Sequence, residues 1–182
     1  VLENAYDIIV TGEINGEDTL SFKIPYRDGK RGYIDSEKKI QIVDDVYKVR
    51  TVTDTRDTDG SAVTEVYAEA EFYDLTFSVR KEERTFEAEY PETAMAYALE
   101  GTEWSVGTVT VRTKRTWTST EKNALSILRN TADLHGGDLV FDCPNRLVHL
   151  LTVNGRDSGA LFAYRKNMKS IQRVVDTREL VT

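Results

Sequence analysis

Residues 118–153 read TSTEKNALSILRNTADLHGG and then DLVFDCPNRLVHLLTV, the most strongly patterned part of the chain. Thr118 and Glu121 have the capping-box spacing, in which each side chain satisfies the other residue's free backbone N–H. Apolar residues then recur on one half of a 3.6-residue wheel, and Gly136 or Gly137 supplies the left-handed residue that ends a helix. The segment therefore predicts an amphipathic helix of about 16 residues, too short to be stable alone. Its apolar positions are Ala124, Leu125, Ile127, Leu128, Ala132 and Leu134.

A strand hairpin is predicted directly after this helix. Leu139 and Phe141 fall on one face of a period-two pattern, Pro144-Asn145 suits a turn, and Leu147–Val153 returns as a mostly apolar strand. Because the helix must bury its apolar face, we expect it to lie on a sheet, with this hairpin as the nearest candidate.

Composition excludes several classes of protein. The chain has 182 residues, of which 40% are hydrophobic and 30% charged, which argues against disorder. A net charge of −7 argues against general binding to nucleic acid or to anionic membranes. No apolar run approaches the ~20 residues of a membrane span, and no signal peptide is recognised. A single cysteine excludes an internal disulfide.

The first 74 residues predict strands and no helix. Ile8–Ile14 and Thr19–Ile24 flank Asn15-Gly16, the strongest short hairpin signal, with Leu20, Phe22 and Ile24 on a buried face. Five strands with short links favour a small antiparallel barrel or sandwich. The three further strands are expected around Ile40–Ile42, at Val46–Thr53 and at Glu65–Phe72, with a tight turn at Asp44-Asp45 and a polar loop at Asp54–Ser61.

The pattern changes after Asp74. Leu75–Glu87 predicts one strand or two around an exposed turn at Lys81–Arg84. Pro91 suits the first turn of a second helix and Gly101 the position past its end. Val109 and Val111 mark a further strand.

These patterns predict an α+β, β-rich chain of two domains. Residues 1–74 form the antiparallel β domain, and residues 75–167 form an α+β domain with two helices packed on a sheet. Asn154-Gly155 predicts a turn and Leu161–Tyr164 a short strand. Residues 168–182 predict a strand that leads into a following domain. Since the chain opens at Val1 without a methionine and closes inside a β-branched segment, we expect a fragment of a longer polypeptide.

One cluster of residues has the chemistry of metal ligands. It consists of His135, Asp142, Cys143 and His149. Zinc sites need three or four such groups at short, fixed spacings, and this spacing fits no such pattern. We interpret the set as a helix-end histidine, a strand histidine and a structural cysteine.

The loop DTRDTDGS, residues 54–61, resembles a calcium loop only in part. Asp57, Asp59 and Gly60 match positions three, five and six, but Thr55 and Val66 occupy positions one and twelve, where carboxylates are required. A solvated hairpin loop is the better interpretation.

No catalytic, cofactor-binding or metal-binding residue is assigned. The sequence contains no Gly-x-Ser-x-Gly elbow and no glycine-rich phosphate loop, and nothing indicates a lowered pKa for Cys143. With 31 acidic residues, a carboxylate pair of the glycosidase type carries no information. Trp104 and Trp117 suit either a sugar-stacking platform or cross-strand packing, and packing is the commoner role.

Four stretches together resemble a known family. They are Glu13–Pro25, Ala96–Gly107, Ala124–Asp142 and Lys166–Thr182. In this order they are similar to the N-terminal region of phage and prophage minor structural proteins of Gram-positive hosts, the tail-associated lysin or prophage endopeptidase tail family. The likeness depends on collinearity, since none of the four is a catalytic motif.

The resemblance implies a structural role without enzyme activity in this region. It implies an N-terminal fragment of a tail-tip or baseplate hub, made as a soluble protein in the host cytoplasm and located in the virion at the tail tip. Self-association as a trimer into a ring that continues the tail tube is implied, with the distal tail protein and the tape measure protein as partners. No cofactor, no specific nucleic-acid binding and no membrane span are expected, and any lytic or peptidase domain would lie downstream.

Two other functions remain open at the level of sequence. A peptidoglycan-degrading enzyme would need Cys143, His149 or carboxylates to converge on one site. A carbohydrate-binding module for host adhesion would need Trp104 or Trp117 exposed beside a groove.

Overall fold

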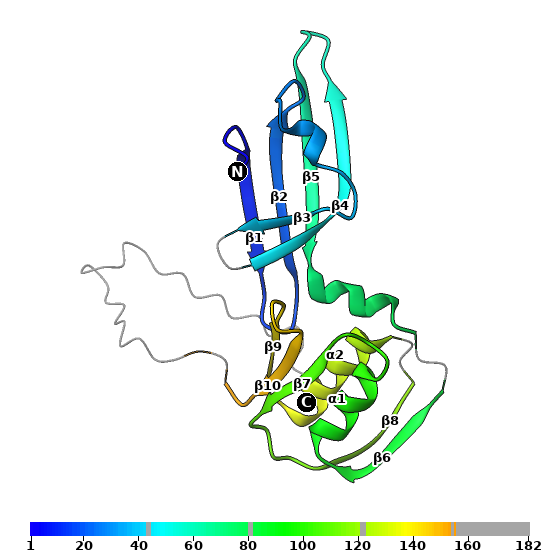
Figure 1. Cartoon of the computed structure of the whole chain (residues 1–182). Coiled ribbons are helices and arrows are strands. Elements are labelled where there is room, and N and C mark those ends of the chain that lie inside the picture. Colours follow the sequence, from blue (N-terminus) through cyan, green and yellow to red (C-terminus); the bar gives the residue numbers. More distant parts are fainter. Residues whose placement is uncertain (43–44, 80–81, 121–122, 154, 156–182) are drawn as a thin grey trace, which may run out of the picture.

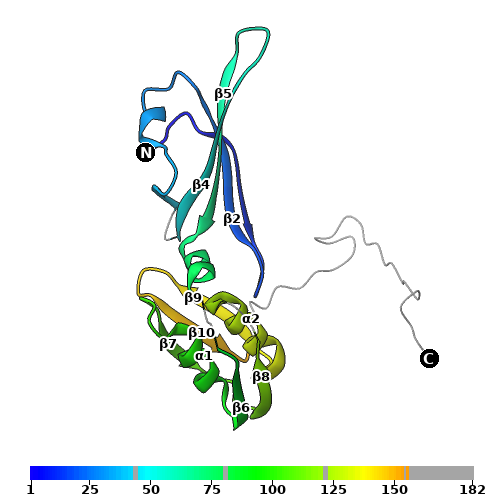
Figure 2. The ribbon, with the colours of Figure 1, turned by 90° about the vertical axis from the view of Figure 1, so that its right-hand side faces the viewer.

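The computed structural model describes residues 1–42, 45–79, 82–120, 123–153 and 155. In this part the chain forms two lobes joined by one short helix, as Figure 1 and Figure 2 show. We call residues 1–70 the upper lobe and residues 78–151 the lower lobe. The α+β, β-rich fold class predicted from the sequence is confirmed.

The upper lobe is one five-stranded sheet in the order β1-β2-β5-β4-β3. Every neighbouring pair is antiparallel. The sheet curls into an open half-barrel, so that β3 crosses in front of β1 and β2 in Figure 1. The strands are β1 (Tyr6–Gly12), β2 (Asp18–Pro25), β3 (Lys39–Ile42), β4 (Asp45–Arg56) and β5 (Ala62–Ala70), and the 3-10 helix η1 (Arg31–Tyr33) lies between β2 and β3.

Alternation in β2 and β5 builds the core of this lobe. Leu20, Phe22 and Ile24 are buried as predicted, and they face the same side of the sheet as Val66 and Ala68, to which Phe22 and Leu20 are paired. The Asn15-Gly16 hairpin between β1 and β2 is confirmed. The residues between the buried ones point to the opposite face, which is polar.

The loop was predicted at Asp54–Ser61, but its first three residues belong to β4, which continues to Arg56. The predicted start of the loop is therefore wrong. Asp54 stays in the strand since its carboxylate accepts hydrogen bonds from Thr64 at 2.6 Å and from Arg31 at 2.8 Å. Only residues 57–61 turn, with Gly60 at a φ of +87°.

The expectation that the first half has no helix is also wrong. Phe72 and Leu75, predicted as strand residues, lie in the 3-10 helix η2 (Glu71–Phe77), which joins the lobes. Both side chains are buried, and the Phe72 ring stacks on Phe141 of the lower lobe. The following strand begins only at Arg84.

The lower lobe combines two helices with two small sheets. One sheet has the order β7-β10-β9, with β10 parallel to β7 and antiparallel to β9, and the other pairs β6 with β8. The hairpin predicted around Pro144-Asn145 is confirmed. The elements are β6 (Arg84–Glu89), α1 (Pro91–Leu99), β7 (Ser105–Val109), β8 (Arg115–Ser119), α2 (Ala124–His135), β9 (Asp138–Asp142) and β10 (Leu147–Leu151).

Both predicted helices form, but α2 begins later than expected. Pro91 stands in the first turn of α1, and Gly136 follows α2 with a φ of +79°. The prediction that Thr118 begins a capping box is wrong, because Thr118 belongs to β8. Asn123 caps α2 instead, with its side chain accepting a hydrogen bond from the Ser126 N–H at 2.9 Å.

The apolar face predicted for α2 is buried, except at Leu134, the last apolar position of the prediction. Leu134 is exposed, while Thr131 and His135 share the buried face. The helix packs against α1 and η2 as well as against β8 and β9. The buried apolar residues of α2 are Ala124, Leu125, Ile127, Leu128 and Ala132.

Some expectations concern residues outside the described part. These are the strands at residues 161–164 and 168–182, and parts of the turns at 44–45 and 154–155. The predicted domain limits, residues 1–74 and 75–167, stay a prediction. Among the described residues, no helix combines the length and the apolar character needed to span a membrane.

Candidate functional site

The edge strand β1 is the most unusual surface of the molecule. Ile8, Ile9 and Val10 are consecutive β-branched residues, and they remain 55%, 59% and 50% exposed. Among the residues that the structure describes, β1 has one strand neighbour, β2. Consecutive apolar residues are typical of strands buried on both faces. Natural sheets normally protect edges with charge, proline or bulges, and β1 has a register irregularity between Tyr6 and Ile9. The edge strand β1 therefore exposes a run of apolar side chains.

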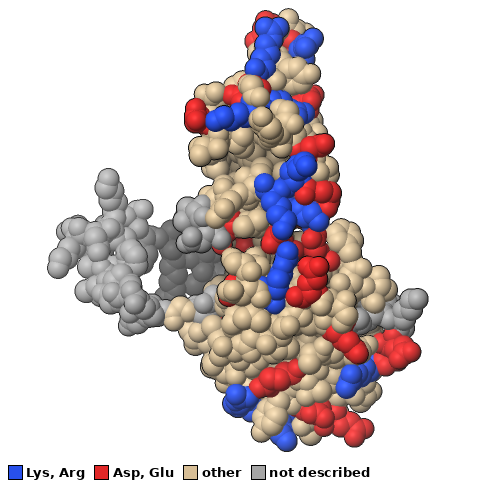
Figure 3. Space-filling view, viewed as in Figure 1, with Lys and Arg blue, Asp and Glu red and all other residues tan. Residues whose placement is uncertain are grey.

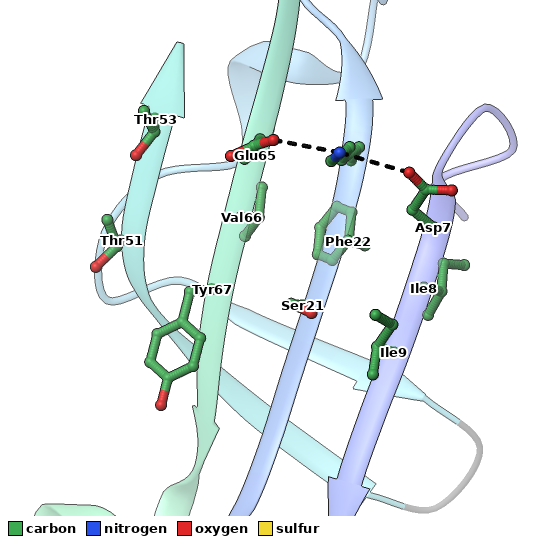
Figure 4. A pocket seen from close by; sticks show the side chains of 11 residues that line it. Asp7, Ile8, Ile9, Ser21, Phe22, Thr51, Thr53, Glu65, Val66 and Tyr67 are labelled. Carbon is green, nitrogen blue, oxygen red and sulfur yellow. Dashed lines mark ion pairs between the residues drawn. The ribbon is translucent and has the colours of Figure 1, made fainter. Parts of the chain in front are cut away.

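A shallow cavity of about 520 Å³ lies on the polar face of the sheet beside β1 (Figure 4). A charged row crosses this face, because Lys23 lies 3.5 Å from the Asp7 carboxylate and 3.4 Å from that of Glu65. A second row, set by strand register, joins Ile9, Ser21, Tyr67 and Thr51. This face presents hydroxyl groups and paired charges.

The other side of β1 borders an apolar groove of about 660 Å³. Its lining includes Ile8 of β1, Phe22 of β2, and Ile40 and Ile42 of β3, together with Leu2. Both edges of the half-barrel thus contribute apolar side chains to one open space. The strand β1 therefore has a groove on each of its faces.

A charged cluster ties β4 to η2 on the polar side. Arg50 is nearly buried, and its guanidinium donates to Asp74 at 2.6 Å, Glu69 at 3.0 Å and Glu37 at 3.1 Å. Lys48 adds a contact of 3.1 Å to Asp74. Burial acts to raise the pKa of Asp74, but hydrogen bonds from Arg50 and Lys48 outweigh it and hold this pKa below its usual value. Figure 3 shows basic and acidic side chains interleaved down this face.

The junction between the lobes centres on the β1–β2 turn. Asn15 donates from its side-chain amide to the Gly137 carbonyl at 3.0 Å and accepts from the Leu139 N–H at 2.6 Å. Arg129 of α2 donates to the Gly16 carbonyl at 2.7 Å. Three hydrogen bonds therefore attach the tip of the upper sheet to the lower lobe.

Aromatic stacking and a buried carboxylate complete this junction. The Phe72 and Phe141 rings stack with centroids 4.0 Å apart, and Trp104 meets Phe141 edge-on at 6.1 Å. Glu71, buried in η2, is paired with Lys39 of the upper lobe and lies 3.4 Å from Arg146 of the lower lobe. Each lobe thus supplies one cation to the same carboxylate.

The four residues with ligand chemistry lie in structural hydrogen bonds. The buried His135 ring has Nδ1 2.9 Å from the Thr113 carbonyl oxygen, and His149 Nδ1 accepts from the Thr108 N–H at 2.8 Å. Asp142 accepts from the Asn145 side chain at 2.8 Å. Burial raises the pKa of Cys143 to about 11. Within the described ranges, no three His, Cys, Asp or Glu side chains gather in a way that could hold a metal ion.

The other candidates from the sequence also have structural positions. Asp59 accepts a hydrogen bond from the Ser61 N–H at 2.8 Å inside the β4–β5 hairpin loop. Trp104 is 5% exposed and Trp117 is half-buried against Phe86. The packing interpretation is confirmed for Trp104, so the exposed tryptophan required by a carbohydrate platform is not found at that position.

Sequence reasoning missed the role of Asn15 at the junction. The Asn-Gly pair indicated a hairpin turn, which is correct, and Asn15 has the positive φ of +58° that such a turn uses. Nothing local in the sequence shows that the same side chain bonds to Leu139, 124 residues away.

Comparison with solved structures shows a similar fold in tail proteins, two of them from prophages. Prophage tail protein gp18 from Listeria monocytogenes EGD-e aligns with a TM-score of 0.74 and 13% identity, over 92% of this chain and 52% of that one. The tail protein from Neisseria meningitidis MC58 aligns with a TM-score of 0.56 and 12% identity, over 87% and 48%. The 43 kDa tail protein of prophage MuSo2 from Shewanella oneidensis gives 0.52 and 10%, over 85% and 52%.

These alignments span about half the length of the three solved proteins. No curated protein sequence matches the chain. Two family models match it side by side, the prophage endopeptidase tail N-terminal domain at residues 1–70 and the prophage endopeptidase tail domain at residues 78–150. The chain belongs to the prophage endopeptidase tail family and is a component of a phage tail.

Proposed function

We propose that this chain is a structural part of the tail tip, in a hub that forms a ring continuing the tail tube. The observation that carries the proposal is the edge strand β1, in which Ile8, Ile9 and Val10 are each at least half exposed. A strand of this kind is a hazard in an isolated molecule and a contact in an assembled one. A closed cyclic assembly buries such edges by head-to-tail contacts.

The rigid junction between the lobes supports the same role. A ring subunit must hold its two parts at a fixed angle, or the contacts of neighbouring copies do not close. Asn15, Arg129 and the Phe72–Phe141 stack supply that rigidity by hydrogen bonding and packing. We infer a trimer in the intact protein, in contact with the distal tail protein and the tape measure protein.

The proposed role is non-catalytic. Three side chains with catalytic chemistry support this: His135 and His149 bond to backbone groups, and the raised pKa keeps Cys143 protonated at neutral pH. A thiol of this kind is a poor nucleophile.

Cryo-electron microscopy of assembled tails tests the location. A small tag in the hairpin loop at Asp59-Gly60, which is exposed and turns away from the core, should give extra density at the tip of each tail. Density repeated along the tube, or absent from purified particles, would contradict the proposal. An untagged sample processed identically is the control.

A further inference from the structure

The β1–β2 turn contains Asn15-Gly16, the kind of pair that loses its side-chain amide most readily. In this reaction the backbone nitrogen of the glycine attacks Cγ of the asparagine and a succinimide ring closes. Ammonia leaves and carries away the proton of the attacking nitrogen. Water then opens the ring to aspartate or isoaspartate, so the whole reaction consumes water and releases ammonia. Glycine favours the attack because it has no side chain to hinder it or to restrict the backbone.

The fold requires both members of this pair. Asn15 has a φ of +58°, and its side chain donates to the Gly137 carbonyl at 3.0 Å and accepts from the Leu139 N–H at 2.6 Å. At Gly16 an added Cβ would lie 2.8 Å from Cβ and Oε2 of Glu13. A larger residue there would therefore force the turn to shift. The chain keeps a reactive pair at the junction between the lobes for structural reasons.

The docked lobes hold this pair away from the reaction. Ring closure requires the Gly16 nitrogen to turn toward Cγ of Asn15 and to lose its proton. In the structure this N–H donates to the Glu13 carbonyl at 3.1 Å, while the lower lobe binds both ends of the Asn15 amide group. Arg129 restrains the turn further through its bond to the Gly16 carbonyl at 2.7 Å. The contacts with the lower lobe must therefore open before the ring can close.

The product of the reaction does not fit the docked junction. An ionised aspartate side chain only accepts hydrogen bonds, so the Gly137 carbonyl would lose its donor and face a carboxylate oxygen. Isoaspartate would in addition insert a methylene group into the backbone of the turn. Either product therefore weakens the contact that Asn15 makes with the lower lobe.

We propose that Asn15-Gly16 is a site of spontaneous deamidation that the docked lower lobe protects, and that its modification loosens the two lobes irreversibly. Each opening of the junction allows the reaction, and the product cannot restore the original hydrogen bonds. The extent of modification thus records how long the lobes have been apart. The inference concerns contacts within one chain and is independent of the proposed self-association.

Peptide mapping by mass spectrometry measures the reaction in the intact tail protein, kept folded or unfolded in urea at the same mildly alkaline pH. Asp59→Asn supplies a matched reference pair in the exposed β4–β5 loop, at the far end of the upper lobe from the junction (Figure 1). There the Gly60 N–H donates to the Asp57 carbonyl at 3.0 Å, so the turn bond is similar.

Folding should slow the loss of ammonia at Asn15 at least about tenfold more than at the reference pair, because two further hydrogen bonds must break first. Equal slowing at the two sites would show that the turn alone protects the pair, and it would overturn the inference. A faster reaction at Asn15 in the folded protein would show that the Leu139 N–H activates the side-chain carbonyl, which would overturn it as well.

Two further comparisons test the role of docking and the effect of the product. Arg129→Ala removes one junction bond without altering the pair and should speed the reaction at Asn15. Arg112→Ala, which removes a lower-lobe arginine paired with Glu92, should not. Asn15→Asp reproduces one product, and amide exchange of Leu139 should accelerate in it. Equal rates in the two arginine variants, or unaltered Leu139 exchange, would contradict the inference. Circular dichroism checks that each variant is folded.

Discussion

The side-chain carbonyl of Asn15 accepts a hydrogen bond of 2.6 Å from the backbone N–H of Leu139, at the start of a strand 124 residues further on. The amide group of the same side chain donates to the Gly137 carbonyl at 3.0 Å. Asn15 thus bonds the chain as a neighbouring strand would, although it stands in a turn. This contact fixes the tip of the upper sheet to the lower lobe.

Replacing Asn15 with glycine should remove these two bonds and keep the turn. Glycine adopts the positive φ of this position without strain, so the cost comes from the lost side chain, about 1–3 kcal/mol for two hydrogen bonds. Urea unfolding measures it, and amide exchange of Leu139 should accelerate while that of Leu20 in β2 changes little. Asn15→Ala should cost more, because alanine is strained there. Unchanged Leu139 exchange in both variants would show that the bond does not hold the lobes.

Gly107 leaves room for the His149 ring between β7 and β10. A Cβ at this position would lie 2.6 Å from Cε1 and Nδ1 of His149, whose ring is held by the Thr108 N–H. Gly107→Ala should therefore destabilise the protein by about 1–3 kcal/mol, the usual cost of overpacking. Thermal unfolding measures the change.

A double-mutant cycle separates the clash from other effects. Adding His149→Ala should recover part of the loss, because the ring that the new methyl group meets is gone. Gly29→Ala is the matched control, since a methyl group added there would have nothing within 4 Å of it beyond its chain neighbours. Equal losses at Gly29 and Gly107 would count against the close approach.

Cys143 should react slowly with alkylating reagents. Its pKa, raised by burial to about 11, leaves only a trace of thiolate at pH 8. Against an ordinary thiol of pKa 9.0, this difference corresponds to roughly 100-fold less thiolate. Iodoacetamide labelling followed by mass spectrometry gives the rate, which should rise about tenfold per pH unit below that pKa. Ser36→Cys in a Cys143→Ser background supplies an exposed comparison, and equal rates would refute the buried, protonated thiol.

Acid should lower the free energy of unfolding by protonating Asp74, which ties η2 to β4. Burial alone would raise its pKa, but hydrogen bonds from Arg50 and Lys48 lower it from the ordinary value of 3.8. A folded-state pKa below the unfolded one means that the unfolded chain binds the proton more tightly, so the stabilisation is present above about pH 4 and is lost as pH falls through the folded pKa.

Asp74→Asn should flatten the dependence of unfolding free energy on pH in that range. Urea unfolding between pH 2 and pH 6, roughly the span over which such a carboxylate titrates, measures the slope. Asp133→Asn, on the surface of α2, makes the same change in net charge and should leave the slope nearly unchanged. Identical slopes for the two variants would remove Asp74 as the source.

The elements predicted correctly are those whose signals are local. The apolar face of α2 and its end at Gly136 follow from periodicity and one glycine, and the Asn15-Gly16 and Pro144-Asn145 hairpins follow from turn chemistry. The buried face of β2 follows from alternation. Each of these features is decided within about ten residues of chain.

The errors occur where distant partners decide the structure. Thr118 and Glu121 have capping-box spacing, yet β8 continues through Ser119 because it pairs with β6, with Arg84 opposite Ser119. Asp54 remains in β4 because Arg31 and Thr64 bind it. Phe72 leaves the alternation of β5 to stack on Phe141 of the lower lobe. No such contact can be inferred from the neighbouring sequence.

Some features of the candidate site could likewise be predicted from the sequence, and others required the folded structure. The apolar residues of β1 could be seen in the sequence, but their exposure on an edge strand required the sheet order. The rings of His135 and His149, two of the residues with ligand chemistry, bond to backbone groups. The role of Asn15 in joining the lobes required the folded chain.

Light scattering of the intact tail protein, with and without Ile9→Lys, tests most directly the claim that β1 is an assembly surface. The unaltered protein should have the mass of a trimer. The variant should be monomeric with an unchanged circular-dichroism spectrum, because Ile9 is exposed and its replacement disturbs only the contact between copies. Leu134→Lys, an exposed apolar position on α2, should remain trimeric. A monomeric unaltered protein, or a trimer that survives Ile9→Lys, would contradict the claim.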